Sequence, residues 1–241
     1  MTRNPDLSQP AAKPRTRGKR ILAAVGCCLI LCVLAALLIG YYGSSVTQAI
    51  SAHRAVRYAE EAHPGYVYTI EKVESEPGFI DDVFLQAEGS LDNHFIVTYN
   101  LGRLMGDSYD NQVANGGNTW NRISDRLWAD TKAALAEAGL TEAQVSLWHD
   151  YIMLDGVEQA VPAEGRPALT VDMPYDPANL PPVALLLDVN CDAITNETPA
   201  EAEAYLQQAR EAAQAAGLDF AAYAVTMLAA DGQHYTTELA L

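Results

Sequence analysis

One uninterrupted apolar stretch near the N-terminus constrains this chain more than any other feature. Residues 21–39 contain no charged or strongly polar side chain, and eleven of these nineteen residues are Leu, Ile or Val. At a rise of about 1.5 Å per residue, a helix of this length matches the roughly 30 Å hydrocarbon core of a bilayer. Tyr41 and Tyr42 follow, where aromatic side chains gather at a membrane interface. The sequence therefore predicts a transmembrane helix over residues 21–42.

The charges beside this stretch predict its orientation. Residues 1–20 carry six basic side chains and one acidic one, whereas no Asp, Glu, Lys or Arg occurs between Arg20 and Arg54. Lys and Arg are retained on the cytoplasmic side of a membrane helix. We therefore expect residues 1–20 to form a basic cytoplasmic tail and residues 43–241 to be extracellular. This arrangement is that of a single-pass protein of the cell membrane.

Two other interpretations of the apolar stretch stay open. A basic segment followed by an apolar core is also typical of a signal peptide, and Thr47-Gln48-Ala49 resembles a small-residue cleavage site. The nineteen apolar residues exceed the roughly 7–15 of a signal peptide core, which favours an uncleaved signal-anchor. A lipoprotein site at Cys27 is disfavoured, because this cysteine lies near the beginning of the stretch and not at its end.

The remaining 221 residues are strongly acidic, with 9 basic and 30 acidic side chains. A charge of -21 repels phosphate groups and disfavours a nucleic acid as partner. Three of the four cysteines, Cys27, Cys28 and Cys32, lie within the predicted membrane helix, which leaves Cys191 outside it. A single cysteine forms no internal disulfide, so we expect the outer part of the chain to be stabilised by its hydrophobic core.

Local patterns after the membrane helix predict a mixed α and β domain. Apolar residues at helical spacing predict a helix over Ser45–Ala62, ended by His63-Pro64-Gly65. Runs rich in Tyr, Val, Ile and Phe then predict strands at Tyr66–Val73, Phe79–Ala87 and Asn93–Asn100. Because the links between these runs are short and polar, an antiparallel meander is expected.

A second helix is expected after this meander. Residues 107–117 indicate a loop or a short helical stretch that ends in two glycines. Asn118 or Thr119 is then expected to cap a helix with one apolar face, which Gly139 ends.

Residues 141–154 carry two conflicting patterns. Thr141-Glu142-Ala143-Gln144 has the form of a helix capping box, whereas Val145–Leu154 has the composition of a strand, and a short turn followed by the strand is favoured. Residues 155–182 then contain six of the twelve prolines, and only Ala168–Met173 among them is strand-like. This stretch indicates a boundary between two subdomains, or a long surface excursion.

The last sixty residues predict a strand, a helix and a hairpin. Val183–Val189 is an apolar run typical of a buried strand, and Thr198-Pro199-Ala200-Glu201 is a complete capping box that begins a helix. Phe220–Leu228 and Gln233–Leu239 then flank Asp231-Gly232, which is a strong hairpin signal. The order of elements resembles that of the preceding half, so an internal duplication stays open.

Few residues have the spacing of a known catalytic or metal site. The five histidines have no partner at metal-ligand spacing, and the three tryptophans are interpreted as packing residues. The histidines are His53, His63, His94, His149 and His234, and the tryptophans are Trp120, Trp128 and Trp148. The sequence has no phosphate-binding glycine loop and no serine nucleophile motif. It therefore assigns no catalytic, cofactor-binding or metal-binding residue and predicts no cofactor.

Two pairs of carboxylates are the candidates for acid–base chemistry. Asp81 lies next to Asp82, and Asp107 lies three residues before Asp110. Either pair could share a proton, although the sequence fixes neither a partner nor a cleft for it. In a segment this acidic, such pairs are also expected by chance.

The segment from Asp188 to Glu197 is the candidate for a metal. It begins like a calcium-binding loop, with oxygen ligands at alternate positions. However, Ala193 and Pro199 stand where such a loop requires a glycine and a bidentate glutamate. We therefore interpret the segment as a loop before a capped helix and not as a metal site.

The stretch from Asp107 to Trp128, DSYDNQVANGGNTWNRISDRLW, resembles the YfjL-like group of small membrane-anchored proteins of Gram-positive bacteria. The resemblance covers residues 20–135 and rests on the order of elements, on Tyr58 and the PGYVYTI run, and on a D-x-x-Y/D…N-T-x-x-R pattern. It implies a cell-surface protein with an outer α+β domain of no assigned activity, and it supplies no catalytic residue.

The predicted fold class is α+β, with one N-terminal transmembrane helix and an extracytoplasmic antiparallel sheet packed by two or three helices. Residues 43–174 are expected to form a first ectodomain unit and residues 175–241 a second. The expected function is that of a bacterial envelope protein with a non-enzymatic binding, sensing or scaffolding ectodomain, held in the lipid bilayer by residues 21–42. Its partner would be an envelope protein or ligand. The alternative is an anchored extracytoplasmic hydrolase that uses an unrecognised carboxylate pair.

Overall fold

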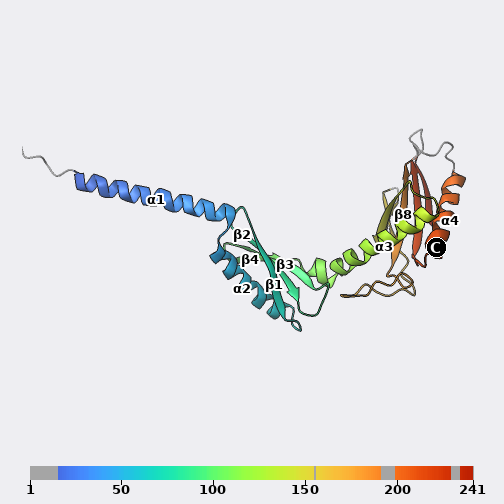
Figure 1. Cartoon of the computed structure of the whole chain (residues 1–241), viewed down its shortest axis with the longest axis horizontal. Helices are drawn as coiled ribbons and strands as arrows, with labels where there is room; N and C mark the ends of the chain where they lie inside the picture. The colour runs from blue at the N-terminus through green and yellow to red at the C-terminus, as the bar shows by residue number, and fades with distance from the viewer. Residues whose placement is uncertain (1–15, 155, 191–198, 229–233, 241) are drawn as a thin grey trace, which may run out of the picture. The chain divides into compact units, whose positions relative to one another are not determined.

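The computed structural model shows a mixed α and β protein, as the sequence predicts. It describes residues 16–154, 156–190, 199–228 and 234–240. These residues divide into two compact units, and Figure 1 labels their elements. The first unit contains the residues up to 85 together with 96–106, and the second contains 86–95 together with the residues from 107 onward.

The first unit begins with the long apolar helix α1, Thr16–Tyr42. Its segment Arg20–Tyr41 is long and apolar enough to cross a membrane, and the large apolar side chains along it are exposed. An apolar surface of this size is not expected to face water. Helix α1 is therefore a candidate for a membrane span or for a signal sequence, and the predicted helix over 21–42 is confirmed.

A second helix and a four-stranded sheet complete this unit. Helix α2 spans Ser45–Ala62, as predicted, and Oγ of Ser44 caps it by accepting the N–H of Thr47 at 3.1 Å. The strands lie side by side in chain order: β1 (Tyr68–Glu76), β2 (Ile80–Ala87), β3 (His94–Asn100) and β4 (Arg103–Asp107). This is the predicted meander with one further strand, β4, in which all five residues are exposed.

One face of the four-stranded sheet is buried beneath α2. Every second residue of β2 and β3 is buried, which is the alternation of a sheet with one covered face. Helix α2 buries Ser51, Ala55 and Ala59, which are four residues apart and so share one face. A hydrogen bond of 2.8 Å from Oγ of Ser51 to Asp81 connects the helix to β2.

The end of α1 is joined to the turn between β1 and β2. The carbonyl oxygen of Gly40 accepts the N–H groups of Gly78 and Phe79, at 2.8 and 3.3 Å. Gly40 is buried, and a Cβ atom there would lie only 2.5 Å from the Phe79 ring. Any larger residue at this position would therefore require the Phe79 ring to shift.

The second unit contains a four-stranded sheet in the order β10-β9-β8-β5. Its strands are β5 (Ala143–His149), β8 (Val183–Asn190), β9 (Ala222–Leu228) and β10 (His234–Ala240). The sheet departs from the expected antiparallel arrangement at one pair, since β8 and β9 run parallel while the other neighbours are antiparallel. Helix α4 (Pro199–Ala215) connects β8 to β9, and parallel strands need such a crossover.

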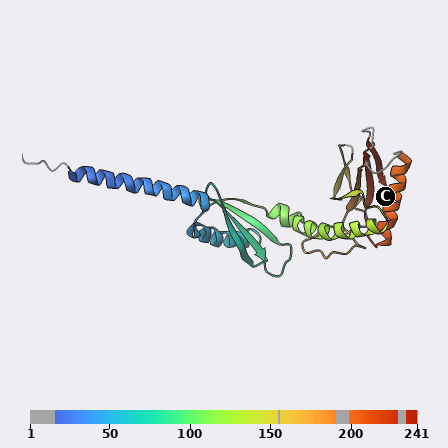
Figure 2. The same ribbon diagram turned by 45° about the horizontal axis from the view of Figure 1, so that its top comes forward.

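Both faces of the central strands β8 and β9 are covered. One face packs against α3 (Gly117–Glu137) and α4, which lie on the same side of the sheet in Figures 1 and 2. The other face packs against residues of the hairpin formed by β6 (Tyr151–Leu154) and β7 (Val157–Ala160). The side chains on the hairpin side are mostly small: Ala184, Leu186, Ala222 and Ala224.

The start of α3 differs from the prediction. The residue before the helix is Gly116, at φ 72, and it provides no side-chain cap. Its place cannot be taken by a capping residue without strain, because a Cβ atom would lie 2.7 Å from the Leu169 side chain. Asn118 and Thr119, the predicted caps, lie inside the first turn of α3 and bond to other parts of the second unit.

Two of the predicted strands are also corrected. The single strand over Val145–Leu154 is broken at Asp150, which has φ 64, into β5 and β6 of two different sheets. Ala168–Met173 forms no strand, because Asp172 has φ 59 and its carboxylate accepts the backbone N–H groups of Leu91 and Asp92. The choice of a strand over a helix is confirmed, since no helix begins at Thr141, but the strand begins at Ala143 and so replaces the second half of the expected turn.

The predicted boundary after residue 174 falls inside the second unit, because β5 and β8 lie on opposite sides of it in sequence and pair with each other. The short helical stretch predicted within 107–117 is a π-helix at Asp110–Ala114. Helix α4 and the antiparallel pair β9–β10 confirm the C-terminal helix and hairpin. Thr198, the Asp231-Gly232 turn and Cys191 lie outside the described residues.

Candidate functional site

The adjacent carboxylates Asp81 and Asp82 do not form an acid–base pair. Asp81 is buried and accepts hydrogen bonds from Oγ of Ser51 at 2.8 Å and from Oγ of Ser75 at 2.6 Å. Asp82 points to the other face of β2, as its neighbour in a strand must, and accepts one from Oγ1 of Thr98 at 2.6 Å. Each carboxylate therefore has its own hydroxyl partners.

The second candidate pair, Asp107 and Asp110, lies in a turn and has a structural role there. Asp107 ends β4, and its carboxylate accepts the backbone N–H of Tyr109 at 2.8 Å. Asp110 is the first residue of the π-helix, and both carboxylates are exposed. An exposed pair in a turn does not form the enclosed cleft in which an acid–base pair would act on a substrate.

The candidate metal segment is described only at its start. Asp188 lies on β8, and burial raises the pKa of its carboxyl group. The remainder of the segment, from residue 191 to Glu197, lies outside the described residues. Within the described part of the chain, no three His, Cys, Asp or Glu side chains gather in a way that could hold a metal ion.

The N-T-x-x-R residues of α3 hold the turn between β2 and β3. Arg122 binds the buried carboxylate of Asp92 with two hydrogen bonds, at 2.9 and 2.7 Å, and Oγ1 of Thr119 donates a third at 2.7 Å. Nδ2 of Asn118 donates to the carbonyl oxygens of Asp92 and His94, at 2.8 and 2.6 Å. The Arg122 guanidinium holds the pKa of Asp92 below its usual range. The pattern thus has a structural role in the second unit.

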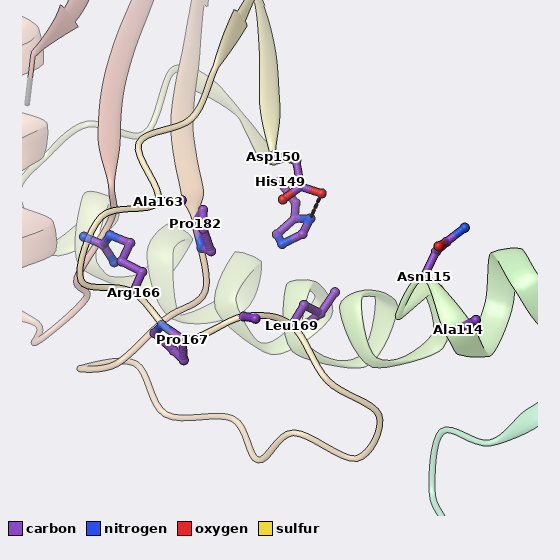
Figure 3. Close-up of a pocket in the computed structure, with 10 residues that line it drawn as sticks. Ala114, Asn115, His149, Asp150, Ala163, Arg166, Pro167, Leu169 and Pro182 are labelled. Atoms are coloured by element: carbon purple, nitrogen blue, oxygen red, sulfur yellow. Dashed lines mark ion pairs between the residues drawn. The ribbon is translucent and has the colours of Figure 1, made fainter.

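A cavity of about 370 Å³ lies at the end of β5. Figure 3 shows the His149 imidazole extending toward the loop that carries Pro167 and Leu169. Nδ1 of His149 lies 3.0 Å from a carboxylate oxygen of Asp150, the residue whose left-handed backbone ends the strand. A residue other than glycine at positive φ is uncommon, and such positions are enriched at functional sites.

The other ring nitrogen of His149 is unusual. Nε2 is buried and has no hydrogen-bond partner among the residues that the structure describes. Burial lowers the pKa of the His149 imidazole, and the Asp150 carboxylate opposes this shift. The ring of Trp120 packs against the imidazole, with 5.2 Å between the ring centroids. The cavity thus contains an oriented imidazole with one nitrogen unused.

A second concave surface is lined in part by Trp120. We call it the indole hollow and define it by its lining residues: Trp120, Ser124, Asp125, Trp128 and Leu147. It measures about 330 Å³ and lies between α3 and the edge strand β5. Trp128 is 45% exposed, which is unusual for so large an apolar side chain. Nζ of Lys132 lies 4.7 Å from the centre of its ring.

Sequence reasoning missed both concave surfaces. It gave the histidines no metal-binding role and interpreted the tryptophans as core or interface packing residues. Trp148 packs against the core, whereas Trp128 is exposed. One signal was available: the helical spacing of eight residues places Trp120 and Trp128 on nearly the same face of α3. The pairing of α3 with β5 that forms the hollow has no local signature.

A scan against protein-family models finds no match, and neither do searches of curated proteins and of solved structures.

Proposed function

We propose that this chain is a single-pass protein of the bacterial cell envelope, anchored by α1, with its N-terminus in the cytoplasm and an extracellular ectodomain that binds a partner without catalysis. We also propose that it belongs with the YfjL-like group. The exposed apolar surface of α1 supports the anchor. Basic residues before α1 and uncharged residues after it support the orientation.

The contacts at the end of α1 favour an anchor over a cleaved signal peptide. Cleavage after Ala49 would cut α2 within its second turn and remove its cap, Ser44. It would also remove Gly40, which bonds to the turn between β1 and β2, and Gln48, which donates to Oγ of Ser75 at 3.1 Å. A folded domain that uses residues on both sides of a cleavage site is better explained by an intact chain.

The indole hollow is the observation that carries the proposal of a binding function. Exposed indoles are enriched where proteins meet their partners, because they supply a large contact area and lose little side-chain entropy. In this hollow Trp128 is exposed beside Trp120 and Leu147. The polar side chains of Ser124 and Asp125 also line it. The acidic charge of the ectodomain favours an uncharged or basic partner.

Neither candidate pair of carboxylates supports the hydrolase alternative. Asp81 and Asp82 point to opposite faces of β2, and Asp107 and Asp110 lie exposed in a turn. We therefore propose the binding function alone.

Cross-linking in intact cells tests the proposal. The full-length chain, recovered from membranes, is compared with Trp128→Ala, which removes the exposed indole of the hollow. Tyr151→Ala is the matched control, because Tyr151 is also an exposed aromatic residue, 46% accessible, and lies on β6 away from the hollow. The cross-linked partner should be lost in Trp128→Ala and kept in Tyr151→Ala. Equal recovery by all three chains would refute the role of the hollow.

A further inference from the structure

The cavity at the end of β5 has features of a ligand site that are independent of the indole hollow. A side chain with an unused buried polar atom is destabilising unless water or a ligand completes its hydrogen bonds. Nε2 of His149 is such an atom, and the side chain to which it belongs is only 16% exposed. The neighbouring cavity, of about 370 Å³, lies within the roughly 300–1,000 Å³ range of small-molecule sites.

The hydrogen-bonding state of His149 determines what Nε2 can bind. A carboxylate only accepts hydrogen bonds, so Nδ1, at 3.0 Å from Asp150, carries the hydrogen of this contact. In the neutral imidazole Nε2 then has a free lone pair, and burial favours the neutral form by lowering the pKa of His149. The atom therefore needs a hydrogen-bond donor, such as a hydroxyl group.

The charges around the cavity disfavour an ionic ligand. The Asp150 carboxylate faces an anion with like charge. Arg166 would repel a cation, and its guanidinium already donates to the carbonyl oxygen and the carboxylate of Asp219, at 2.6 and 3.1 Å. Figure 3 shows this guanidinium directed away from His149. A neutral ligand is repelled neither by the Asp150 carboxylate nor by the Arg166 guanidinium.

Apolar side chains form one part of the cavity wall, beside the polar side chains of Asn115, Asp150 and Arg166. Pro167, Leu169 and Pro182 line the cavity, together with alanines on the same loop. In Figure 3 these side chains and His149 surround one space, which belongs wholly to the second unit. This apolar part of the wall suits the ring of a small ligand, while the polar part suits a hydroxyl group.

We propose that this cavity binds a small, neutral, mainly apolar molecule with one hydroxyl group, a phenol-like compound, whose hydroxyl donates to Nε2 of His149. The apolar ring of the ligand packs between Leu169 and the prolines, and the Asp150 carboxylate keeps the imidazole in the tautomer that accepts the hydrogen bond. No bond is made or broken in this process.

Two matched probes test this assignment with the full-length chain in lipid nanodiscs. The first is p-cresol, and the second is 4-methylanisole, which has the same ring but no hydroxyl donor. Binding is followed by calorimetry and by ¹⁵N NMR of labelled histidine, in which the Nε2 signal of His149 should move with p-cresol. We expect 4-methylanisole to bind at least tenfold more weakly. Equal affinity for the two probes, or p-cresol binding without a change at Nε2, would overturn the proposal.

Two variants separate the role of His149 from that of the cavity. His149→Phe keeps an aromatic ring against Trp120 but removes the acceptor, and should weaken p-cresol binding at least tenfold. Ala168→Phe, at an exposed position of the lining, should fill the cavity and abolish binding while the His149 signal persists. His53→Phe, on the exposed side of α2, is the control and should change nothing. Undiminished binding in either cavity variant would contradict the proposed site.

Discussion

The sheet of the first unit is buried on one face, whereas the central strands of the sheet in the second unit are covered on both. In β2 and β3 buried residues alternate with half-buried ones, and α2 is joined to the buried face by the hydrogen bond from Ser51 to Asp81. In β8 every residue from Val183 to Leu187 is buried, because helices cover one face and the β6–β7 hairpin contacts the other. The indole hollow and the His149 cavity both lie at β5, the edge strand of the doubly covered sheet, where the covering layers end.

This difference suggests a division of roles between the units. The first unit is attached to the apolar helix through Gly40 and provides a small sheet whose second face is only half-buried. The second has the larger core and both concave surfaces. Support from two layers fixes the position of the edge strand β5, which carries the half-buried His149, and of helix α3, which carries the exposed Trp128.

The largest expected effect comes from the charge pair buried in the second unit. Arg122→Met should destabilise that unit by about 3–5 kcal/mol, because the buried carboxylate of Asp92 loses its cation. Arg57→Met is the control in the first unit, where the Arg57–Glu61 pair is exposed and contributes about 0–1 kcal/mol. Amide hydrogen exchange of the full-length chain measures both. Similar small losses in the two variants would mean that the Asp92 pair is not essential to the second unit.

Two leucines that are both fully buried allow a direct comparison of the two sheets. Leu185→Ala in β8 and Leu85→Ala in β2 each remove the same atoms, and such changes destabilise by about 2–5 kcal/mol. The loss depends on how well the surroundings collapse into the space. We expect Leu185→Ala to lie near the upper end and Leu85→Ala near the lower end. If hydrogen exchange shows a larger loss of stability in Leu85→Ala than in Leu185→Ala, the expected difference between the singly and the doubly covered sheet is wrong.

The same contrast explains which parts of the fold could be predicted. Local sequence patterns predict helix α2 and the strands β2, β3 and β8. The patterns are a helical or strand periodicity of apolar residues, or a continuous apolar run. Strand β4 has no such signal, since all its residues are exposed. The parallel pairing of β8 with β9 depends on how α4 crosses the sheet, and no residue of β8 encodes it locally.

The candidate sites were harder to predict for a related reason. Asp81 and Asp82 are adjacent in sequence but a strand turns them to opposite faces, so nearness in sequence gave a pair that does not exist in space. His149 and Trp120 are far apart in sequence and touch only because α3 packs on β5. The break occurs at Asp150, which has φ 64; aspartate tolerates this left-handed conformation, but a single aspartate within a strand-like run is too weak a signal to predict it.

A smaller effect is expected from the ends of the helices. Ser44→Ala should destabilise the first unit by about 0.5–2 kcal/mol, the usual range for a lost helix cap. In the second unit Gly116→Ser introduces a residue that is normally a good cap, yet it should also destabilise, because Gly116 has φ 72 and Leu169 occupies the space of a Cβ. Thermal unfolding of the two variants is the measurement. A gain of stability in Gly116→Ser would show that this account of α3 is wrong.

The smallest effect should be a pH dependence confined to the second unit. The pKa of His149 is lower in the folded chain than its unfolded value of about 6.5, so the unfolded state binds more protons as the pH falls. This contribution to stability is complete above about pH 6.5 and is lost as the pH falls toward the folded pKa. In His149→Phe that part of the pH dependence should disappear, as followed by hydrogen exchange between pH 7 and pH 5. An unchanged pH dependence in the variant would exclude His149 as its source.

The central claim is that α1 remains attached and holds the folded units outside the cell. Protease added to intact cells whose wall has been removed tests this most directly, with mass spectrometry of the chain before and after digestion. We predict an intact chain before digestion, and afterwards a protected N-terminal fragment that ends shortly after residue 43. A chain that begins at Ile50 before digestion, or units that survive in intact cells but are digested after lysis, would contradict it.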